Sequence, residues 1–276
     1  MASELAITSS DAIARRFAEL KDASRKAFIP YVTAGHPDPV RSIALLQGLE
    51  AAGADVIEVG VPFSDPLADG AVIQASSQRA LDQGVRFDDV LRIISDARLS
   101  VPVVLFSYLN PLLRGGDDAL RRAADAGAHG VLVTDLPLGA DPEREAWFAD
   151  GPLDFIRLVA PTTPSERMSR IASTGRGFVY LISRLGVTGE QATLSAELPA
   201  TAARLRAATS LPVCIGFGIA TAAQARAAAA LADGIVVGSA IVRAADTSVD
   251  AAVALRPAGT VGVETSAVGG VPPVPV

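Results

Sequence analysis

The sequence has little of what several protein classes require. Its single cysteine, Cys214, allows no internal disulfide, and its two histidines, His36 and His129, have no evident second ligand or base partner. No apolar run of 18 residues and no signal-type amino terminus is present. A net charge of −6 and a pI near 5.0 argue against a nucleic-acid or anionic-membrane surface. We therefore expect a soluble, cytoplasmic protein.

The length and composition allow one large α/β domain. The chain has 276 residues, half of them apolar, and α/β barrels of about 250 residues are single domains. The pattern predicts an amphipathic leading helix over 11–23, a first strand over 27–33 and a helix from Pro39 capped by Asp38. In that helix Val40, Ile43, Leu46 and Leu49 recur every three residues. Further helices are expected over 71–81 and 87–97, and strands over 101–107, 155–159, 178–182 and 212–215.

One phrase recurs along the chain in altered form. It reads A-G-A-D-V-I-E-V-G from 52, A-G-A-H-G-V-L-V-T-D from 126 and A-L-A-D-G-I-V-V-G-S from 230. Each copy is a helix end, a short break and an apolar strand, and the spacing fits repeating units of roughly 35 residues, near the length of a βα unit. Eight strands can be counted. The sequence therefore predicts a single (β/α)8 TIM barrel over 1–256, with an extra amino-terminal helix and a short flexible tail over 257–276.

The stretch from Ala54 to Gly70, A-D-V-I-E-V-G-V-P-F-S-D-P-L-A-D-G, reads as a buried strand that ends in a loop. Strand alternation points Glu58 away from Ile57 and Val59. Glu58 is either half of a structural ion pair or an acid or base whose pKa is raised by burial. Asp69 favours the second interpretation, because the prolines of the loop would hold it in place above the strand end.

Three glycine-rich stretches follow expected strands six, seven and eight. They are S-R-L-G-V-T-G at 183–189, G-F-G-I at 216–219 and G-S-A-I at 238–241. Each alone is consistent with an ordinary turn. Together, at neighbouring strand ends of a barrel, they favour a phosphate pocket, with a helix amino terminus after Gly238 and Ser239.

These motifs, with Y-V-T-A-G-H-P-D at the first strand and V-T-D-L-P at the fourth, resemble those of the tryptophan synthase alpha subunit family from about Phe28 to Val242. The resemblance implies retro-aldol cleavage of indole-3-glycerol phosphate to indole and glyceraldehyde 3-phosphate, with no metal or organic cofactor in this chain. Glu58 matches the general acid/base and Asp69 the carboxylate near the indole nitrogen. The remaining matches fall into three groups: phosphate-binding positions Gly189, Phe217, Gly218, Gly238 and Ser239; indole-pocket and lid positions Tyr31, Phe106, Tyr108, Leu132, Tyr180 and Thr188; and partner-contact positions Pro62, Asp65 and Asn110.

The resemblance also implies a partner, a beta subunit that carries pyridoxal phosphate and receives the indole, in an assembly of two alpha and two beta chains. Phe106 and Leu132 are equally consistent with ordinary barrel core, and Asp65 with a loop or capping residue. Two features depart from the family pattern: Ala71 replaces a proline, which would leave the catalytic loop more mobile, and the closing helix shrinks to about 248–256. The alternatives are a free-standing lyase, a weakly catalytic activator of the beta subunit, and another phosphate-sugar barrel such as an epimerase.

Overall fold

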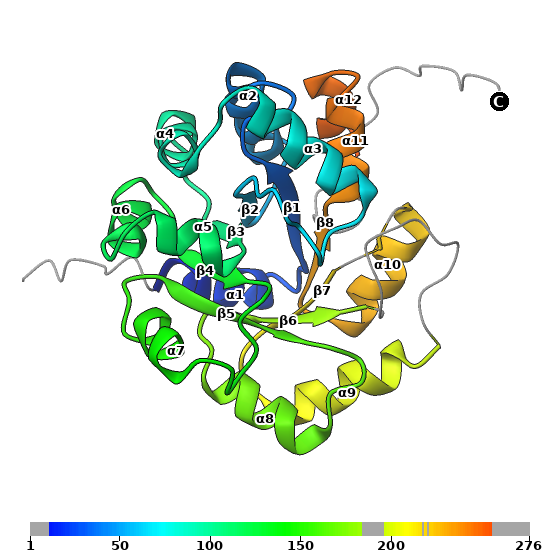
Figure 1. Cartoon of the computed structure of the whole chain (residues 1–276). Coiled ribbons are helices and arrows are strands. Elements are labelled where there is room, and N and C mark those ends of the chain that lie inside the picture. The colour runs from blue at the N-terminus through cyan, green and yellow to red at the C-terminus, as the bar shows by residue number, and fades with distance from the viewer. Residues whose placement is uncertain (1–10, 184–195, 217, 220, 256–276) are drawn as a thin grey trace, which may run out of the picture.

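Eight parallel strands form a closed barrel with helices arranged around it (Figure 1). The computed structural model describes residues 11–183, 196–216, 218–219 and 221–255, so the expected tail over 257–276 lies outside the described residues. The strands pair in chain order from β1 to β8, and β8 closes the barrel by pairing with β1. The predicted TIM barrel is confirmed. Its strands are β1 (Ala27–Thr33), β2 (Ile57–Gly60), β3 (Val103–Ser107), β4 (Gly130–Val133), β5 (Asp154–Val159), β6 (Val179–Ile182), β7 (Val213–Gly216) and β8 (Gly234–Val237).

The helices follow the strands as expected for a barrel of this kind. After the leading helix, they connect successive strands and cover the outside of the sheet. The short closing helix lies within the predicted 248–256 and begins after Ser248, whose side chain accepts a hydrogen bond from the Ala251 N–H. The helices are α1 (Ala12–Asp22), α2 (Pro39–Ala51), α3 (Ala71–Asp82), α4 (Phe87–Ala97), α5 (Leu109–Arg114), α6 (Ala119–Asp125), α7 (Pro142–Ala149), α8 (Ser165–Ser173), α9 (Leu198–Ala208), α10 (Ala222–Leu231), α11 (Ser239–Ala245) and α12 (Val249–Val253).

Strand alternation divides the apolar side chains into an inner and an outer layer. In β1, Ile29 and Tyr31 belong to the cluster inside the barrel, while Phe28 and Val32 pack under the surrounding helices. The same alternation gives the strands nearly continuous apolar sequences, because both faces of a parallel sheet are buried. A polar side chain that points inward is therefore surrounded by apolar neighbours unless it lies at an open end.

The leading helix α1 closes one end of the barrel. Ile13, Phe17 and Leu20 pack into the inner cluster, and the Phe17 and Phe178 rings lie 5.8 Å apart. Asp55, fully buried, anchors this helix by accepting hydrogen bonds from Arg16 and from the Phe28 N–H. With its amino-terminal end plugged, the barrel is open to ligands at the carboxyl ends of its strands.

The second helix begins where the sequence predicts, but its apolar repeat of three residues does not follow one buried face. Asp38 caps α2 and accepts a hydrogen bond from the Arg41 N–H at 2.9 Å. Val40, however, is 77 % exposed, and the buried side chains of α2 are Ser42, Leu45, Leu46 and Leu49. A repeat of three residues drifts around a helix of 3.6 residues per turn, so Val40 leaves the face that Leu46 and Leu49 occupy.

Across the described part of the chain, none of the helices combines the length and the apolar character that crossing a membrane requires.

Candidate active site

Glu58 lies in the middle of β2 and points into the barrel. Strand alternation sends Ile57 and Val59 outward to the helices, as predicted, which leaves Glu58 on the inner face opposite Tyr31 of β1. The side chain is 0 % exposed, and within the described residues neither carboxyl oxygen has a hydrogen-bond partner. Burial raises the pKa of Glu58 from 4.5 to about 8. A structural ion pair is therefore not the reason for this charge, and Glu58 is set up to hold a proton at neutral pH.

Asp69 lies on the loop that follows β2 and lines one cavity together with Glu58. The loop ends at Gly70, the residue before α3, so Asp69 lies two residues before the first residue of the helix. Burial raises the pKa of Asp69 from 3.8 to about 6, while a hydrogen bond with the Tyr108 hydroxyl lowers it in part. At pH 7 Asp69 is mostly ionised and Glu58 mostly neutral. The two carboxyl groups thus differ in protonation state because their surroundings differ.

One cavity at the barrel mouth brings most of the predicted residues together. Glu58 and Asp69 line it, with the aromatic rings of three predicted side chains and the backbone of two predicted glycines around them. The Tyr31 and Phe106 rings meet edge to face with centroids 5.2 Å apart. The apolar walls and few polar groups are typical of a small-molecule site. The cavity is lined by Tyr31, Glu58, Asp69, Ile73, Phe106, Tyr180, Gly218, Ile219, Val236, Gly238 and Ser239.

Two predicted pocket residues lie beside this cavity without lining it. The Tyr108 hydroxyl accepts a hydrogen bond from the Ala68 N–H at 2.9 Å and is hydrogen-bonded to Asp69, so it holds the loop in place. Leu132 of β4 is fully buried in the inner cluster. Tyr108 therefore contacts the carboxylate loop, and Leu132 contributes to the barrel core.

The predicted phosphate positions divide between described and undescribed residues. Gly218, Gly238 and Ser239 lie at the cavity, after β7 and β8. Gly218 has φ +85°, a conformation that favours glycine. Phe217, Thr188 and Gly189 lie outside the described residues, as does the loop that the sequence analysis interprets as a lid.

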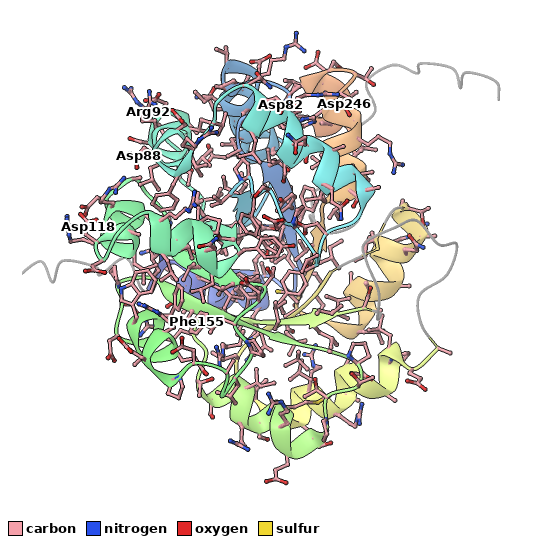
Figure 2. The ribbon with its side chains drawn as sticks, viewed as in Figure 1. Asp82, Asp88, Arg92, Asp118, Phe155 and Asp246 are labelled. Carbon is pink, nitrogen blue, oxygen red and sulfur yellow. The ribbon has the colours of Figure 1, made fainter. Side chains whose placement is uncertain are left out.

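The three predicted partner-contact residues line one surface groove. Pro62 and Asp65 of the loop after β2 and Asn110 of α5 border a groove of about 730 Å³. Asp88 of α4 and Arg122 of α6 form an ion pair at this groove, and Asp118 lies 3.8 Å from Arg122. Figure 2 shows Asp88 and Asp118 on neighbouring helices at the surface. The groove and the catalytic cavity share the loop over 61–70.

Sequence reasoning missed three cavity residues, Ile73, Ile219 and Val236. Ile219 ends the G-F-G-I stretch, of which the sequence analysis assigns only Phe217 and Gly218 to the site. Val236 is an inward residue of β8 by strand alternation, a signal that was available. Ile73 belongs to α3, and its approach to the cavity depends on how that helix packs, which no local pattern reveals.

The two histidines and the cysteine are accounted for by packing. His36 Nε2 lies 3.3 Å from the Val242 carbonyl and 3.4 Å from Asp246, which Figure 2 places at the end of α11. His129 Nδ1 accepts a hydrogen bond from the Val103 N–H, and Cys214 is buried in the inner cluster. Within 11–183 and the later described ranges, no three His, Cys, Asp or Glu side chains are grouped as metal ligands would be.

The sequence of the chain is similar to that of a known protein family. A family model described as tryptophan synthase alpha chain matches residues 17–258. The tryptophan synthase alpha chain of Desulfatibacillum aliphaticivorans is 46 % identical over 234 residues, which are 84 % of this chain and 88 % of that protein. The tryptophan synthase alpha chain of Synechococcus sp. (strain CC9902) is 47 % identical over 239 residues, 85 % of this chain and 88 % of that protein.

Solved structures agree with the sequence matches. A structure of Mycobacterium tuberculosis tryptophan synthase superimposes with a TM-score of 0.83 at 37 % identity, covering 92 % of this chain and 98 % of that chain. The tryptophan synthase alpha subunit from Legionella pneumophila str. Paris gives a TM-score of 0.80 at 35 % identity and covers 88 % and 95 % of the two chains. The likeness thus extends over nearly the whole barrel.

Proposed function

The chain belongs to the tryptophan synthase alpha chain family, and on that basis we propose that Glu58 and Asp69 perform the family reaction in the cavity described above. The chain is a lyase of tryptophan biosynthesis that cleaves indole-3-glycerol phosphate to indole and glyceraldehyde 3-phosphate. The observation that supports the assignment of roles is the pair of carboxyl groups at one cavity, one neutral and one ionised at pH 7.

The separated pKa values fit the order of proton transfers. Neutral Glu58 donates its proton to the indole ring carbon that carries the glycerol chain. The positive charge that develops at the ring nitrogen is stabilised by ionised Asp69. Glu58, now a carboxylate, takes the proton of the adjacent side-chain hydroxyl as the carbon–carbon bond breaks. The proton balance closes, because Glu58 ends the cycle neutral as it began.

The rest of the cavity suits the other two parts of the substrate. The aromatic rings of Tyr31, Phe106 and Tyr180 provide apolar walls for a flat indole ring. The glycine backbone at Gly218 and Gly238 allows a phosphate to approach closely, with the Ser239 hydroxyl beside it. We therefore place the indole among the rings and the phosphate at the ends of β7 and β8.

The groove at Pro62, Asp65 and Asn110 is the surface we propose for a beta subunit, in an assembly of two chains of each kind. It shares the loop that carries Asp69, so docking there would act directly on the catalytic loop. The cleavage chemistry proposed here uses only side chains of this chain, and pyridoxal phosphate would belong to the partner. We propose that this chain and its partner work in the cytoplasm.

Indole release measured with and without a beta subunit tests this proposal. We expect slow turnover that rises by about an order of magnitude or more when the partner is added, because the partner orders the catalytic loop. Asp65→Ala should raise the partner concentration needed for half-maximal activation about tenfold. Asp150→Ala, which removes an exposed carboxylate at the end of α7, is the control and should not. Fast turnover that ignores the partner would contradict the subunit assignment and favour a free-standing lyase.

A further inference from the structure

Two side chains from outside the loop over 61–70 bind the part of that loop that carries Asp69. Gln74 of α3 donates a hydrogen bond from Nε2 to the Asp69 carbonyl at 2.8 Å. Tyr108, the residue before α5, accepts a hydrogen bond from the Ala68 N–H at 2.9 Å. The loop is therefore held on one side by an exposed side chain and on the other by a buried tyrosine.

The Tyr108 hydroxyl also binds the side chain of Asp69, and the direction of that hydrogen bond follows from the groups involved. The Ala68 N–H only donates, so it uses a lone pair of the phenol oxygen. An ionised carboxylate only accepts, so Tyr108 donates its hydrogen to Asp69. Burial, and then the negative charge of Asp69, raise the pKa of Tyr108 well above its usual value, so the hydroxyl keeps this hydrogen at every working pH.

The ring of Tyr108 packs against a residue of the surface groove. The Tyr108 and Phe63 ring centroids lie 5.1 Å apart with 35° between the ring planes, and Phe63 lines the groove. Helix α5, which begins directly after Tyr108, contributes Asn110 and Arg114 to the same groove. One side chain therefore contacts the groove wall with its ring and the catalytic carboxylate with its hydroxyl.

We propose that Tyr108 is a positioning residue that fixes the Asp69 carboxylate for catalysis, and that an occupant of the groove acts on this carboxylate through Phe63 and Tyr108. An occupant that holds the Phe63 ring also holds the Tyr108 ring against it, and the hydroxyl then keeps Asp69 at the cavity. This inference rests on the proposed function, since it needs Asp69 to act in the cleavage and a beta subunit to occupy the groove.

Tyr108→Phe keeps the ring and removes only the hydroxyl. For the chain alone, kcat/KM for indole release should fall roughly threefold or more. Burial raises the Asp69 pKa to about 6 and the Tyr108 hydrogen bond partly offsets this, so the acidic midpoint of the kcat/KM profile should move to higher pH, by roughly half a unit or more. An unchanged acidic midpoint would overturn the inference. The other titratable side chains that line the cavity are the same in this variant, and they are Tyr31, Glu58 and Tyr180.

The matched control is Gln74→Met, which removes the other side chain that binds the loop. Gln74 binds the Asp69 backbone carbonyl, so the hydrogen bond from Tyr108 to the carboxylate is kept. We expect this variant to keep the wild-type acidic midpoint, even where a looser loop lowers kcat. If both variants move the midpoint equally, Tyr108 acts only by holding the loop backbone, and the inference fails.

Activation by a saturating beta subunit tests the connection to the groove. The wild type and Gln74→Met should both be activated by about an order of magnitude or more, because docking orders the loop in each. Tyr108→Phe should be activated less than about threefold, since no hydroxyl remains to hold Asp69. Saturation removes any difference in the affinity for the partner. Activation of Tyr108→Phe by the wild-type factor would overturn the inference.

Phe63→Leu interrupts the connection at its other end. The Tyr108 hydroxyl is intact in this variant, so the chain alone should keep the wild-type acidic midpoint. Its activation by a saturating beta subunit should fall as that of Tyr108→Phe does, and the double variant should lose no more than either single variant. Full activation of Phe63→Leu, or losses that simply add, would contradict a route through the two rings.

The wild type separates the two levels of the account. If it releases no indole, or releases it equally fast with and without the beta subunit, the proposed function fails and the inference with it. If the wild type is activated and the Tyr108→Phe and Phe63→Leu variants are activated by the same factor, the inference alone is rejected.

Discussion

The Tyr31 hydroxyl occupies the space that a side chain at Gly60 would need. A methyl group added at Gly60 would stand 2.0 Å from that oxygen, and one added at Gly216 would stand 1.9 Å from the Tyr180 hydroxyl. Each tyrosine therefore leans over a glycine of the next strand, toward the carboxyl end of the barrel. These two glycines are required because the aromatic side chains that wall the cavity lie across them.

We expect Gly60→Ala to destabilise the protein by about 1 to 3 kcal/mol, because Tyr31 must move out of its place in a close-packed interior. The control is Gly238→Ala, whose added methyl would meet Tyr31 at an ordinary 3.4 Å and whose φ of −112° suits any residue. Chemical denaturation of the two variants measures the difference. Equal stability of both would show that Tyr31 moves at no cost.

Gly238→Asp should raise KM for indole-3-glycerol phosphate by about tenfold or more, since a carboxylate would face the substrate phosphate. Steady-state kinetics with Gly238→Ala beside it separates charge from bulk. An unchanged KM in the Asp variant would place the phosphate elsewhere.

The two carboxyl groups predict a bell-shaped pH profile. Catalysis needs ionised Asp69 and protonated Glu58, so kcat/KM should rise with pH through about 6 and fall through about 8. The Asp69→Asn variant should keep a small residual activity. Its kcat/KM should no longer rise with pH on the acidic side but should still fall on the basic side. A wild-type kcat/KM that stays constant from about pH 5 to about pH 9 would contradict the assignment.

Stability should fall as pH rises between about 4.5 and 8. In this window folded Glu58, with its pKa raised to about 8, binds a proton that the unfolded chain has released. The folded state therefore holds more protons, and the free energy of unfolding decreases with rising pH, by on the order of a few kcal/mol in total. Glu58→Gln should flatten this dependence when unfolding is followed at several pH values. If the slope is the same in the variant, Glu58 does not carry the proton.

Local patterns predicted the barrel because its layers are built from local signals. Alternation in A-D-V-I-E-V-G placed Glu58 inside, and Gly53 and Gly127, both with positive φ, end the helices of the first two repeat copies. The contacts that the sequence does not predict join segments that are distant along the chain. Ser76 meets Thr33 across 43 residues, and Asp55 meets Arg16 across 39, so neither contact has a sequence pattern. Val40 is exposed although it belongs to the apolar repeat of α2, because a repeat of three residues drifts around an α-helix.

The most direct test of the central claim is indole release by Glu58→Gln compared with Asp154→Asn. Both changes replace a buried carboxyl group by an amide of the same shape, but Asp154 begins β5, at the end of the barrel opposite the cavity. We predict that Glu58→Gln loses at least about a hundredfold in kcat, the usual contribution of a proton-transfer group, while keeping its fold. Asp154→Asn should stay within a few fold of the wild type. Turnover by Glu58→Gln close to that of Asp154→Asn would contradict the account.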